Sequence, residues 1–272
     1  MVKLEWYHYI FLSTILIKDA IEKGSTEITN GIQNYKEFRS LPELHKAVLR
    51  SDMDRIKQLI NSGVNLEEKD KKGETALFYA LDKNLVNIAR YLIQNHADVN
   101  VTNHNGKPAI LTAIQFNQYD LVKLMLNHGL KLQNPNGTVL TLACNTKQVN
   151  FKLVQLFVEQ GVSINAKDKN SYSALMYLAT NEAPNLDIIR YLIQKGADVN
   201  AKDRAGKSIL RLLIEARTHH LRLIQILLEN HADPNLKDNE GQTIFDFIQN
   251  YYDHPETNEV VIYLKKYRRK SK

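Results

Sequence analysis

Nine histidines and one cysteine are the residues of this 272-residue chain that could ligate a metal or serve in catalysis. His219 and His220 are neighbours, and consecutive helical residues point in different directions, so this pair is poorly placed to hold a metal ion. His96 and His231 each follow a run with helical spacing and occupy a place where other parts of the chain have glycine, so we expect them to end helices. Neither has a second type of ligand in register, and the sequence predicts no metal site.

The single cysteine, Cys144, cannot form an internal disulfide or complete a zinc site that needs two thiolates. A catalytic thiol needs a nearby base and a lowered pKa, and the sequence places no histidine beside Cys144. The motifs GxSxG and HExxH, a glycine-rich phosphate loop and recurring paired carboxylates are all missing from the sequence. We therefore expect no enzymatic activity, no cofactor and no small-molecule substrate.

The positive charge of the chain is concentrated at its C-terminus. Lys and Arg outnumber Asp and Glu by 36 to 30, and six of the cations are Lys265, Lys266, Arg268, Arg269, Lys270 and Lys272. A surface that follows phosphates needs cations along its whole length, so a nucleic-acid partner is not expected for the nearly neutral body. For the tail, a solvated cap, a contact with acidic lipid or nucleic acid, and a nuclear import signal remain open.

An apolar run, Tyr9 to Ile17, lies near the N-terminus. It is too short to span a bilayer, and Ser13 and Thr14 interrupt the clean apolar stretch that a secretory signal needs. We interpret it as a helix that packs on the elements that follow. A membrane contact through this segment, a targeting signal and a mobile segment are the alternatives. A cytoplasmic protein is therefore the leading expectation, and a secreted or membrane-associated protein is the alternative.

The sequence repeats itself, which indicates the architecture of the whole chain. Gly73 and Gly106 lie 33 residues apart in equivalent segments, and Ser171 and Gly206 lie 35 residues apart. Each unit contains a short apolar run, a polar turn and a longer run with apolar residues three and four positions apart, which predicts two antiparallel helices. A lone pair of short helices cannot bury its apolar face, so the units must stack into an elongated solenoid.

The unit resembles an ankyrin repeat. GADVNAKDRAG at 196–206 is nearly identical to the end of that family's unit, HADVN at 96–100 and HADPN at 231–235 are close to it, and PELHKA at 42–47 resembles its TPLHxA start. The resemblance extends over roughly 41–248. It implies an all-α ankyrin-repeat solenoid of stacked helix-turn-helix units joined by hairpin-like turns, with N- and C-terminal capping helices.

This resemblance divides the chain into three parts: 1–40, an N-terminal apolar helix with a linker or cap; 41–240, six ankyrin-like repeats; and 241–272, C-terminal capping helices with a basic tail. The repeats are 41–72, 73–105, 106–135, 136–170, 171–205 and 206–240. Only the first keeps the family's histidine, His45, so its hydrogen bond should be missing from most units. The turn after Gly129 is about three residues short. The richness in Ile, Lys, Asn and Tyr fits an AT-rich coding sequence, as in many intracellular bacteria.

The resemblance implies a monomer that binds an unidentified protein partner, through positions that vary between units while the frame stays constant. In the family these positions are the turn tips and the ends of the first helices. The tips are Lys71, Lys72, Glu74, His104, Asn105, Lys107, Lys169, Asn170, Tyr172, Arg204, Lys207, Asn239 and Glu240. The helix ends are Asp82, Lys83, Gln115, Phe116, Thr180, Asn181 and Glu215.

Two further expectations concern these units. Phe116 and Tyr172 are aromatic, so each either anchors a partner or packs between neighbouring repeats. The tips mix Lys, Arg, Asn and Glu, so no single sign of charge predicts the partner. Asparagine recurs near the start of almost every turn, and we expect its amide to stabilise the turn; the residues are Asn65, Asn100, Asn165, Asn200 and Asn235.

Fractionation tests the interpretation of the N-terminal run. We expect the full-length protein and a version that starts at Gly24 to stay together in the supernatant after lysis and ultracentrifugation, because the run Tyr9 to Ile17 is too short to span a bilayer. Recovery of the full-length chain alone with the membrane pellet would show that the segment is a tether.

Overall fold

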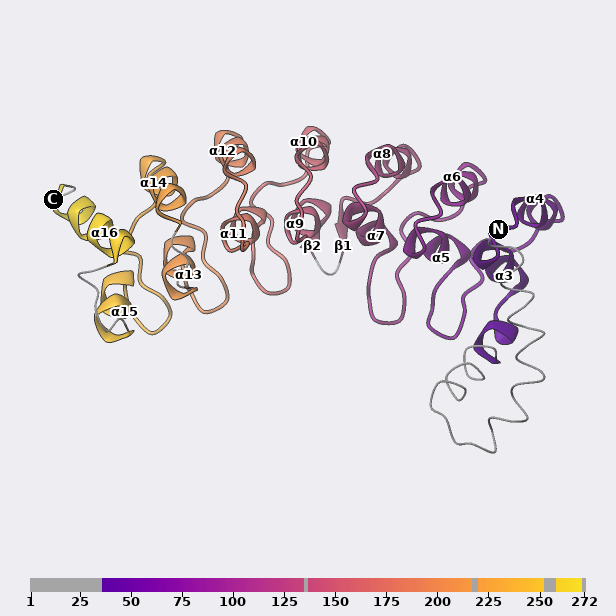
Figure 1. Cartoon of the computed structure of the whole chain (residues 1–272), viewed down its shortest axis with the longest axis horizontal. Helices are drawn as coiled ribbons and strands as arrows, with labels where there is room; N and C mark the ends of the chain where they lie inside the picture. Colours follow the sequence, from indigo (N-terminus) through magenta and orange to yellow (C-terminus); the bar gives the residue numbers. More distant parts are fainter. Residues whose placement is uncertain (1–35, 135–136, 217–219, 252–257, 271–272) are drawn as a thin grey trace, which may run out of the picture.

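The computed structural model describes residues 36–134, 137–216, 220–251 and 258–270, which form an arc of paired helices (Figure 1). The apolar run at 9–17, and with it most of the expected N-terminal helix or cap, lies outside these residues. His219 and the last two residues of the basic tail also lie outside them.

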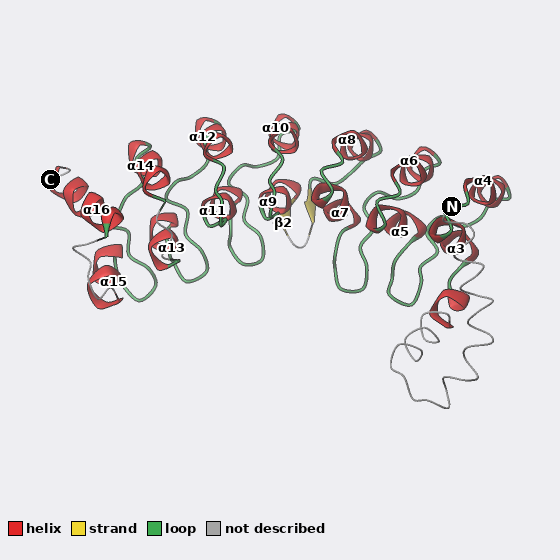
Figure 2. Cartoon of the chain, in the orientation of Figure 1, coloured by secondary structure: helices red, strands yellow, loops and turns green. Residues whose placement is uncertain are grey.

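Each unit joins a short first helix to a second helix of nine or more residues. The pairs are α3 (Glu43–Leu49) with α4 (Met53–Asn61), α5 (Ala76–Asp82) with α6 (Val86–Gln94), α7 (Ala109–Gln115) with α8 (Tyr119–Asn127), α9 (Val139–Cys144) with α10 (Phe151–Glu159), α11 (Ala174–Ala179) with α12 (Leu186–Gln194), α13 (Ile209–Glu215) with α14 (Leu221–Glu229), and α15 (Ile244–Tyr251) with α16 (Glu259–Lys270). A small antiparallel hairpin, β1 (Gln133–Asn134) and β2 (Gly137–Thr138), precedes α9 (Figure 2). The predicted all-α solenoid is confirmed.

Hydroxyl side chains cap the N-termini of five of the first helices; Thr243 caps α15, and the other four share a further feature. The hydroxyls of Thr75, Thr138, Ser173 and Ser208 each accept a hydrogen bond from the backbone N–H three residues later, at 3.1 to 3.3 Å. This bond satisfies one of the N–H groups that a helix start leaves unpaired. All four residues are buried, so the same bond also replaces the water that their hydroxyls have lost.

Second helices end at a residue with a left-handed backbone. His96 and His231 have φ angles of 69° and 68°, and glycine has a positive φ at the same place in other units. The N–H of His96 donates to the carbonyl of Ile93 at 2.9 Å, and the N–H of Ala97 donates to that of Leu92 at 3.0 Å. These bonds satisfy carbonyls at the end of α6. The prediction that the two histidines end helices is confirmed.

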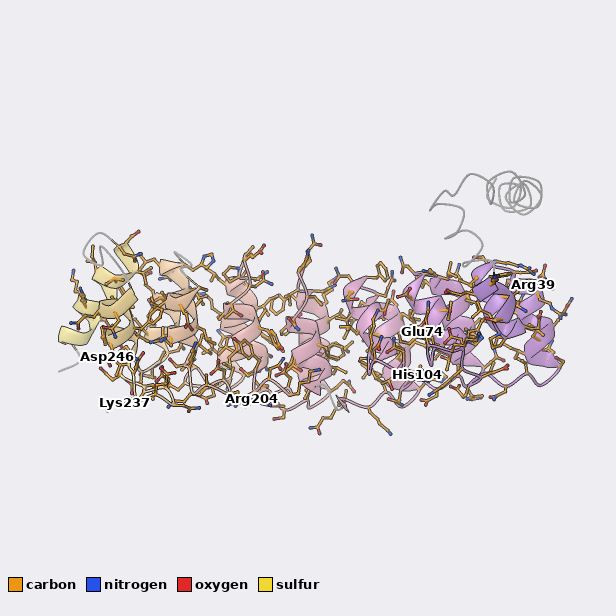
Figure 3. All side chains as sticks on the ribbon, turned by 90° about the horizontal axis from the view of Figure 1, so that it is seen from below. Arg39, Glu74, His104, Arg204, Lys237 and Asp246 are labelled. Atoms are coloured by element: carbon orange, nitrogen blue, oxygen red, sulfur yellow. The ribbon has the colours of Figure 1, made fainter. Side chains whose placement is uncertain are left out.

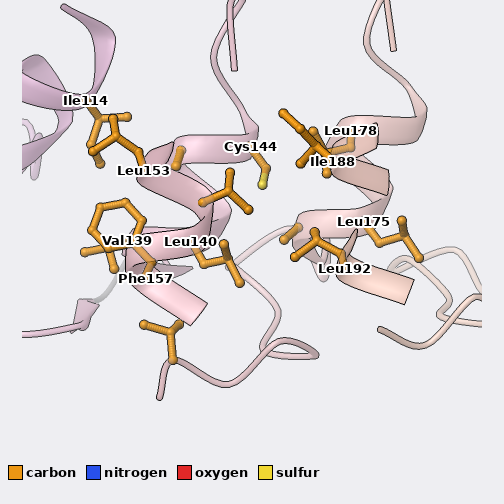
Figure 4. Close-up of a cluster of buried hydrophobic side chains, with 14 of the residues drawn as sticks. Ile114, Val139, Leu140, Cys144, Leu153, Phe157, Leu175, Leu178, Ile188 and Leu192 are labelled. Carbon is orange, nitrogen blue, oxygen red and sulfur yellow. The ribbon is translucent and has the colours of Figure 1, made fainter. Parts of the chain in front are cut away.

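The hydrophobic core runs along the stack between two rows of helices. First helices lie on the concave side of the arc and second helices on the convex side (Figure 1). Phe78 and Phe157 are among the largest side chains that the core buries completely. In the middle units Cys144 of α9 points toward Leu178 and Ile188 of the next pair (Figure 4). Each unit therefore completes its core with side chains of its neighbour.

Extended turns, here called fingers, connect each pair to the next, and one of them is short. The first to sixth fingers are residues 65–74, 98–107, 131–137, 163–172, 198–207 and 233–242. Isolated bridges close the second, fourth and fifth fingers with five residues between the bridged positions, as from Thr102 to Pro108. In the third finger Asn134 pairs directly with Gly137. The predicted short turn after Gly129 is confirmed.

Asparagine side chains bond three of the units to the next. In Asn100, Asn165 and Asn200 the amide nitrogen donates to a carbonyl at the end of the following second helix, and the amide oxygen accepts an N–H of the following finger. For Asn200 the partners are the carbonyl of His231 at 3.1 Å and the N–H of Asp233 at 2.8 Å. These bonds join neighbouring units, whereas the sequence had suggested a role within one turn. Asn65 and Asn235 do have that role, since their side chains bond Glu67 and Asp233 of their own fingers.

Two buried polar side chains of first helices also reach the next unit. His45 Nε2 lies 2.8 Å from the carbonyl oxygen of Glu74. At the same place in the sixth unit, Arg211 donates through Nη1 to the carbonyl of Thr243 at 3.3 Å, and its Nη2 lies 3.8 Å from Oδ2 of Asp238. Arg211 thus links the sixth unit to the next unit, as His45 links the first unit to the second.

Substitution of two equivalent asparagines tests the bonds between units. We expect Asn200→Ala to lower the free energy of unfolding by about 1–2 kcal/mol, because it removes two hydrogen bonds between neighbouring units. Asn235→Ala is the matched control, since its amide nitrogen donates to Asp233 of its own finger, and its loss should be below about 0.5 kcal/mol. Urea unfolding followed by circular dichroism measures both, and equal losses would contradict the role of Asn200 between units.

Candidate partner-binding surface

The concave side of the arc is built from the first helices and the fingers that precede them (Figure 1). Seen from below, the fingers line one edge of the molecule, where His104, Arg204 and Lys237 lie (Figure 3). The predicted helix-end residues are the last residues of the first helices or come directly after them, so they lie at the other end of the same helices. The two predicted groups of binding residues therefore border opposite edges of one surface.

One side-chain oxygen holds the tip of each full-length finger. Oδ1 of Asp70 accepts the N–H of Lys72 at 2.9 Å and that of Glu74 at 2.8 Å. The same two bonds, 2.9 to 3.1 Å long, recur at Asn103, Asp168, Asp203 and Asp238. Such side chains stabilise turns by replacing backbone partners. Sequence reasoning missed these residues, although an Asp or Asn three positions before glycine or serine recurs in phase at each tip.

First helices hold the same carboxylates from the other side. Tyr79 Oη donates to Oδ2 of Asp70 at 2.9 Å, and Tyr177 Oη donates to Oδ2 of Asp168. The guanidinium of Arg211 has the same role at the sixth finger. Three of the finger tips are thereby fixed to the first helices, which reduces the entropy that a partner would have to remove on binding.

The hydroxyls of Tyr79 and Tyr177 keep their protons at neutral pH and therefore act as hydrogen-bond donors. Burial, the hydrogen bond to Asp168 and the negative charge of Asp168 raise the pKa of Tyr177 to about 12. Burial and the corresponding contact with Asp70 also raise the pKa of Tyr79. Neither hydroxyl can therefore serve as a base near neutral pH, and both remain structural.

Neighbouring fingers are also bonded to one another. The N–H of His104 donates to the carbonyl of Lys72 at 2.9 Å. Arg204 Nη2 donates to the carbonyl of Lys169, and Asn239 Nδ2 donates to that of Arg204, both at 3.0 Å. Several residues predicted to contact a partner thus also keep the row of fingers in place.

Most of the predicted binding residues are exposed. They are Lys71, Lys72, Asp82, Lys83, His104, Asn105, Gln115, Phe116, Lys169, Asn170, Arg204, Asn239 and Glu240, whereas Tyr172 and Lys207 are half-buried. Two ion pairs join finger residues to helix ends. Lys107 Nζ lies 3.5 Å from Oδ1 of Asp82, and Lys207 Nζ lies 2.8 Å from Oε2 of Glu215. The structure brings the two predicted groups together at these places.

The two predicted aromatic anchors differ in exposure. Phe116, directly after α7, is 45% exposed. Tyr172 is half-buried, and its ring centroid lies 5.1 Å from that of Tyr177. Phe116 therefore offers a partner the larger apolar area, while Tyr172 is partly used within the fold.

The cysteine and histidines do not form a reactive site in the part of the chain that the structure describes. Cys144 is buried, and burial raises the pKa of its thiol, so it is not a thiolate nucleophile at neutral pH. Among the described residues no three His, Cys, Asp or Glu side chains lie together in a way that could hold a metal ion. No helix within these same ranges has the length and apolar character to cross a bilayer.

The chain matches the family model of ankyrin repeats at residues 44–136 and 110–203. These matches cover more than half of the chain, which therefore belongs to the ankyrin-repeat family, as its motifs predicted. Ankyrin repeats generally act as protein–protein interaction modules, and the family is a non-catalytic fold.

Individual relatives share parts of the chain. An ankyrin repeat protein of Rickettsia felis is 30% identical over 122 residues, 43% of this chain and 40% of that protein. Human protein phosphatase 1 regulatory subunit 27 is 38% identical over 103 residues, 35% of this chain and 67% of that protein. Ankyrin repeat proteins of fowlpox virus and of Acanthamoeba polyphaga mimivirus also match. The chain spans 40% of the length of the first and 13% of the length of the second.

A solved structure shows the same fold over most of the chain. The ankyrin repeat domain of Bcl-3, a member of the IkappaB protein family, matches with a TM-score of 0.64 and 26% identity. The match covers 75% of this chain and 92% of that domain. It places this chain's helix pairs in the same kind of stacked array.

The raised pKa of Tyr177 predicts a loss of stability at high pH. The pKa is about 12 in the folded chain and about 10 when unfolded, so the folded state holds this proton more tightly. The resulting stabilisation is complete below about pH 10 and is lost as the pH rises toward 12. Tyr177→Phe lacks this contribution, so its urea midpoint should fall less steeply between about pH 9.5 and 11.5 than that of the parent.

Asp168→Asn should give an intermediate slope in the same measurement. It removes the charge beside Tyr177 but keeps a side-chain oxygen for the N–H groups of the finger. Parallel curves for the parent and Tyr177→Phe would contradict the assigned contact between Tyr177 and Asp168.

Proposed function

We propose that this chain is a non-catalytic scaffold that holds a protein partner against the concave face and finger tips of its repeats. In this proposal residues 41–240 form the binding module, and 241–272 form its C-terminal cap. The chain acts as a monomer, in the cytoplasm, and needs no cofactor. The observation that carries the proposal is the hydrogen-bonded row of fingers.

The fingers combine a constant frame with variable outward residues. The frame consists of the carboxylate or amide oxygen at each full-length tip and the bonds between neighbouring fingers. The residue after that oxygen is Lys71, His104, Lys169, Arg204 or Asn239. A rigid surface with different side chains at equivalent places binds with little loss of conformational entropy and can distinguish partners.

Phe116 is the strongest single candidate for an anchor on this surface. It is one of two large apolar side chains that the described residues leave exposed; the other, Ile262, lies on α16. Exposed aromatic side chains often contribute a large share of binding energy when a partner buries them. The position of Phe116 at the end of α7 would extend the contact from the fingers to the opposite edge of the concave face.

A tethered adaptor is the alternative function, and it depends on parts of the chain that lie outside the described residues. The apolar run at 9–17 and the last residues of the basic tail would have to supply the tether. In the described part of α16, Lys265 and Lys266 are exposed. This exposure agrees equally well with a solvated cap, so the scaffold remains the better supported function.

Affinity capture followed by mass spectrometry tests the scaffold. We expect the parent protein to recover a specific partner from a cell lysate and the variant Phe116→Ala, Tyr172→Ala, Arg204→Ala to lose it. Loss of one true anchor lowers the affinity by about 2 kcal/mol, or roughly 30-fold. Circular dichroism before capture verifies that the variant is folded.

A matched control changes three exposed lysines of second helices, on the convex side of the arc. The variant is Lys57→Ala, Lys123→Ala, Lys152→Ala. It should recover the same partner as the parent. Recovery of one set of proteins by all three versions would show that the concave face is not the binding surface.

A further inference from the structure

Five cations of the fourth, fifth and sixth fingers lie along one edge of the concave face. We call this group the cationic strip; it consists of Lys167, Lys169, Lys202, Arg204 and Lys237. Four of the five are exposed, and Lys202 is half-buried. Within the described ranges none of them forms an ion pair with a carboxylate, whereas Lys72, Lys107 and Lys207 each do. The charge of the strip therefore remains available to a ligand.

Hydrogen bonds between fingers hold the strip in a regular arrangement. Lys167 Nζ donates to the carbonyl of Lys202 at 2.6 Å, and Lys202 Nζ donates to the carbonyl of Lys237 at 2.7 Å. Arg204 bonds the carbonyl of Lys169 in the opposite direction along the stack. Each ammonium group has three donors, so each keeps two of them and its charge while its position is restrained.

The acidic residues of the same fingers are used differently. Asp168, Asp203 and Asp238 direct Oδ1 into the turn, toward two backbone N–H groups each. Asp198 and Asp233 each accept the N–H of the residue two positions later. These carboxylates thus bond the backbone of their own finger, whereas Lys167, Lys202 and Arg204 reach the backbone of a neighbouring finger.

The strip has clear limits along the stack. The short third finger separates it from the first two fingers, and Lys107 of the second finger is paired with Asp82. The first finger has lysines, but Glu67, Glu68 and Glu74 accompany them. At the other end, Glu240 is exposed at the tip of the sixth finger. The strip is therefore a local feature of the fourth to sixth fingers.

We propose that the cationic strip binds an extended acidic segment of the protein partner, with a carboxylate at every third residue. This inference rests on the scaffold function proposed above and names the chemistry of the partner. Packed helices lie about 8–10 Å apart, and neighbouring fingers repeat with the helices. A polyproline II segment has three residues per turn and rises about 3.1 Å per residue. Every third side chain of such a segment therefore lies on the same face, about 9 Å from the next side chain on that face.

A peptide fits the strip better than a nucleic acid does. Sites for single-stranded nucleic acid combine a cationic groove with aromatic side chains on which successive bases stack. In the described residues of these three fingers the one aromatic side chain is Tyr172, which is half-buried against Tyr177. The strip offers charge and hydrogen-bond donors at regular intervals but no stacking platform.

Fluorescence anisotropy with defined peptides tests the proposal on the full-length protein. The probe is a fluorescein-labelled peptide with five Glu-Pro-Pro repeats, and its isomer places five Glu before ten Pro. The strip variant is Lys169→Gln, Arg204→Gln, Lys237→Gln. The matched control is Lys57→Gln, Lys123→Gln, Lys152→Gln. It also removes three positive charges, but from exposed positions on second helices.

We expect the periodic peptide to bind the parent at 50 mM NaCl and to bind the strip variant about tenfold more weakly. Each exposed ion pair contributes roughly a 1.5- to 5-fold factor in affinity. The control should stay within about twofold of the parent, and the block isomer should bind more weakly than the periodic peptide. Higher salt should weaken binding to the parent, because it screens exposed charges.

Several results would overturn the proposal. They are no binding of the periodic peptide to the parent, equal losses in the strip variant and the control, equal binding of the block isomer, or tighter binding of hexathymidylate, which has the same number of negative charges. The affinity capture described above distinguishes this failure from that of the scaffold. In one outcome the strip variant still captures the partner while the variant at Phe116, Tyr172 and Arg204 does not. In that case the scaffold function stands, and the proposal that the strip binds an acidic segment is wrong.

Discussion

A pair of helices of six to twelve residues cannot bury its own apolar face, and this constraint governs the whole structure. Every pair completes its core with side chains of the next pair, as at Cys144, Leu178 and Ile188. Polar groups follow the same rule, since Asn200 and Arg211 find their partners in the neighbouring unit. The stack is therefore held by contacts between adjacent units, and its surface is elongated because the core is.

The fingers show how such a stack acquires a rigid surface at its exposed edge. A turn of ten polar residues would be mobile by itself, since it buries little apolar area. A carboxylate such as Asp168 prevents this, because one of its oxygens holds the tip and the other accepts from Tyr177 of the first helix. Bonds between fingers then transmit this order along the row. The surface that we propose for partner binding is thus ordered before a partner arrives.

The two halves of the surface differ although their units are built alike. The short third finger interrupts the row, and Phe116 lies exposed at the helix ends on the N-terminal side of that interruption. The cationic strip lies on the C-terminal side. An aromatic contact and a charged contact at opposite edges of one concave face would together position a partner more specifically than either would alone.

The sequence by itself determined the features that depend on neighbouring residues. The period, the helix pairs, the left-handed ends at His96 and His231 and the short third finger follow from apolar spacing and from local backbone preference. The signals for helices and turns lie within a few residues of the elements that they specify, and their recurrence along the chain gives the period. The all-α ankyrin solenoid could therefore be predicted from the sequence.

The tertiary structure alone decided which side chains meet across units. It exposes Phe116, half-buries Tyr172 against Tyr177 and pairs Arg211 with Asp238. It also separates Asp203 from its neighbour Arg204, since the carboxylate turns toward the backbone and the guanidinium extends to the preceding finger. The sequence shows only alternating charges there. Stacking sets the distance between residues that are 27 to 35 positions apart, and no local preference encodes that distance.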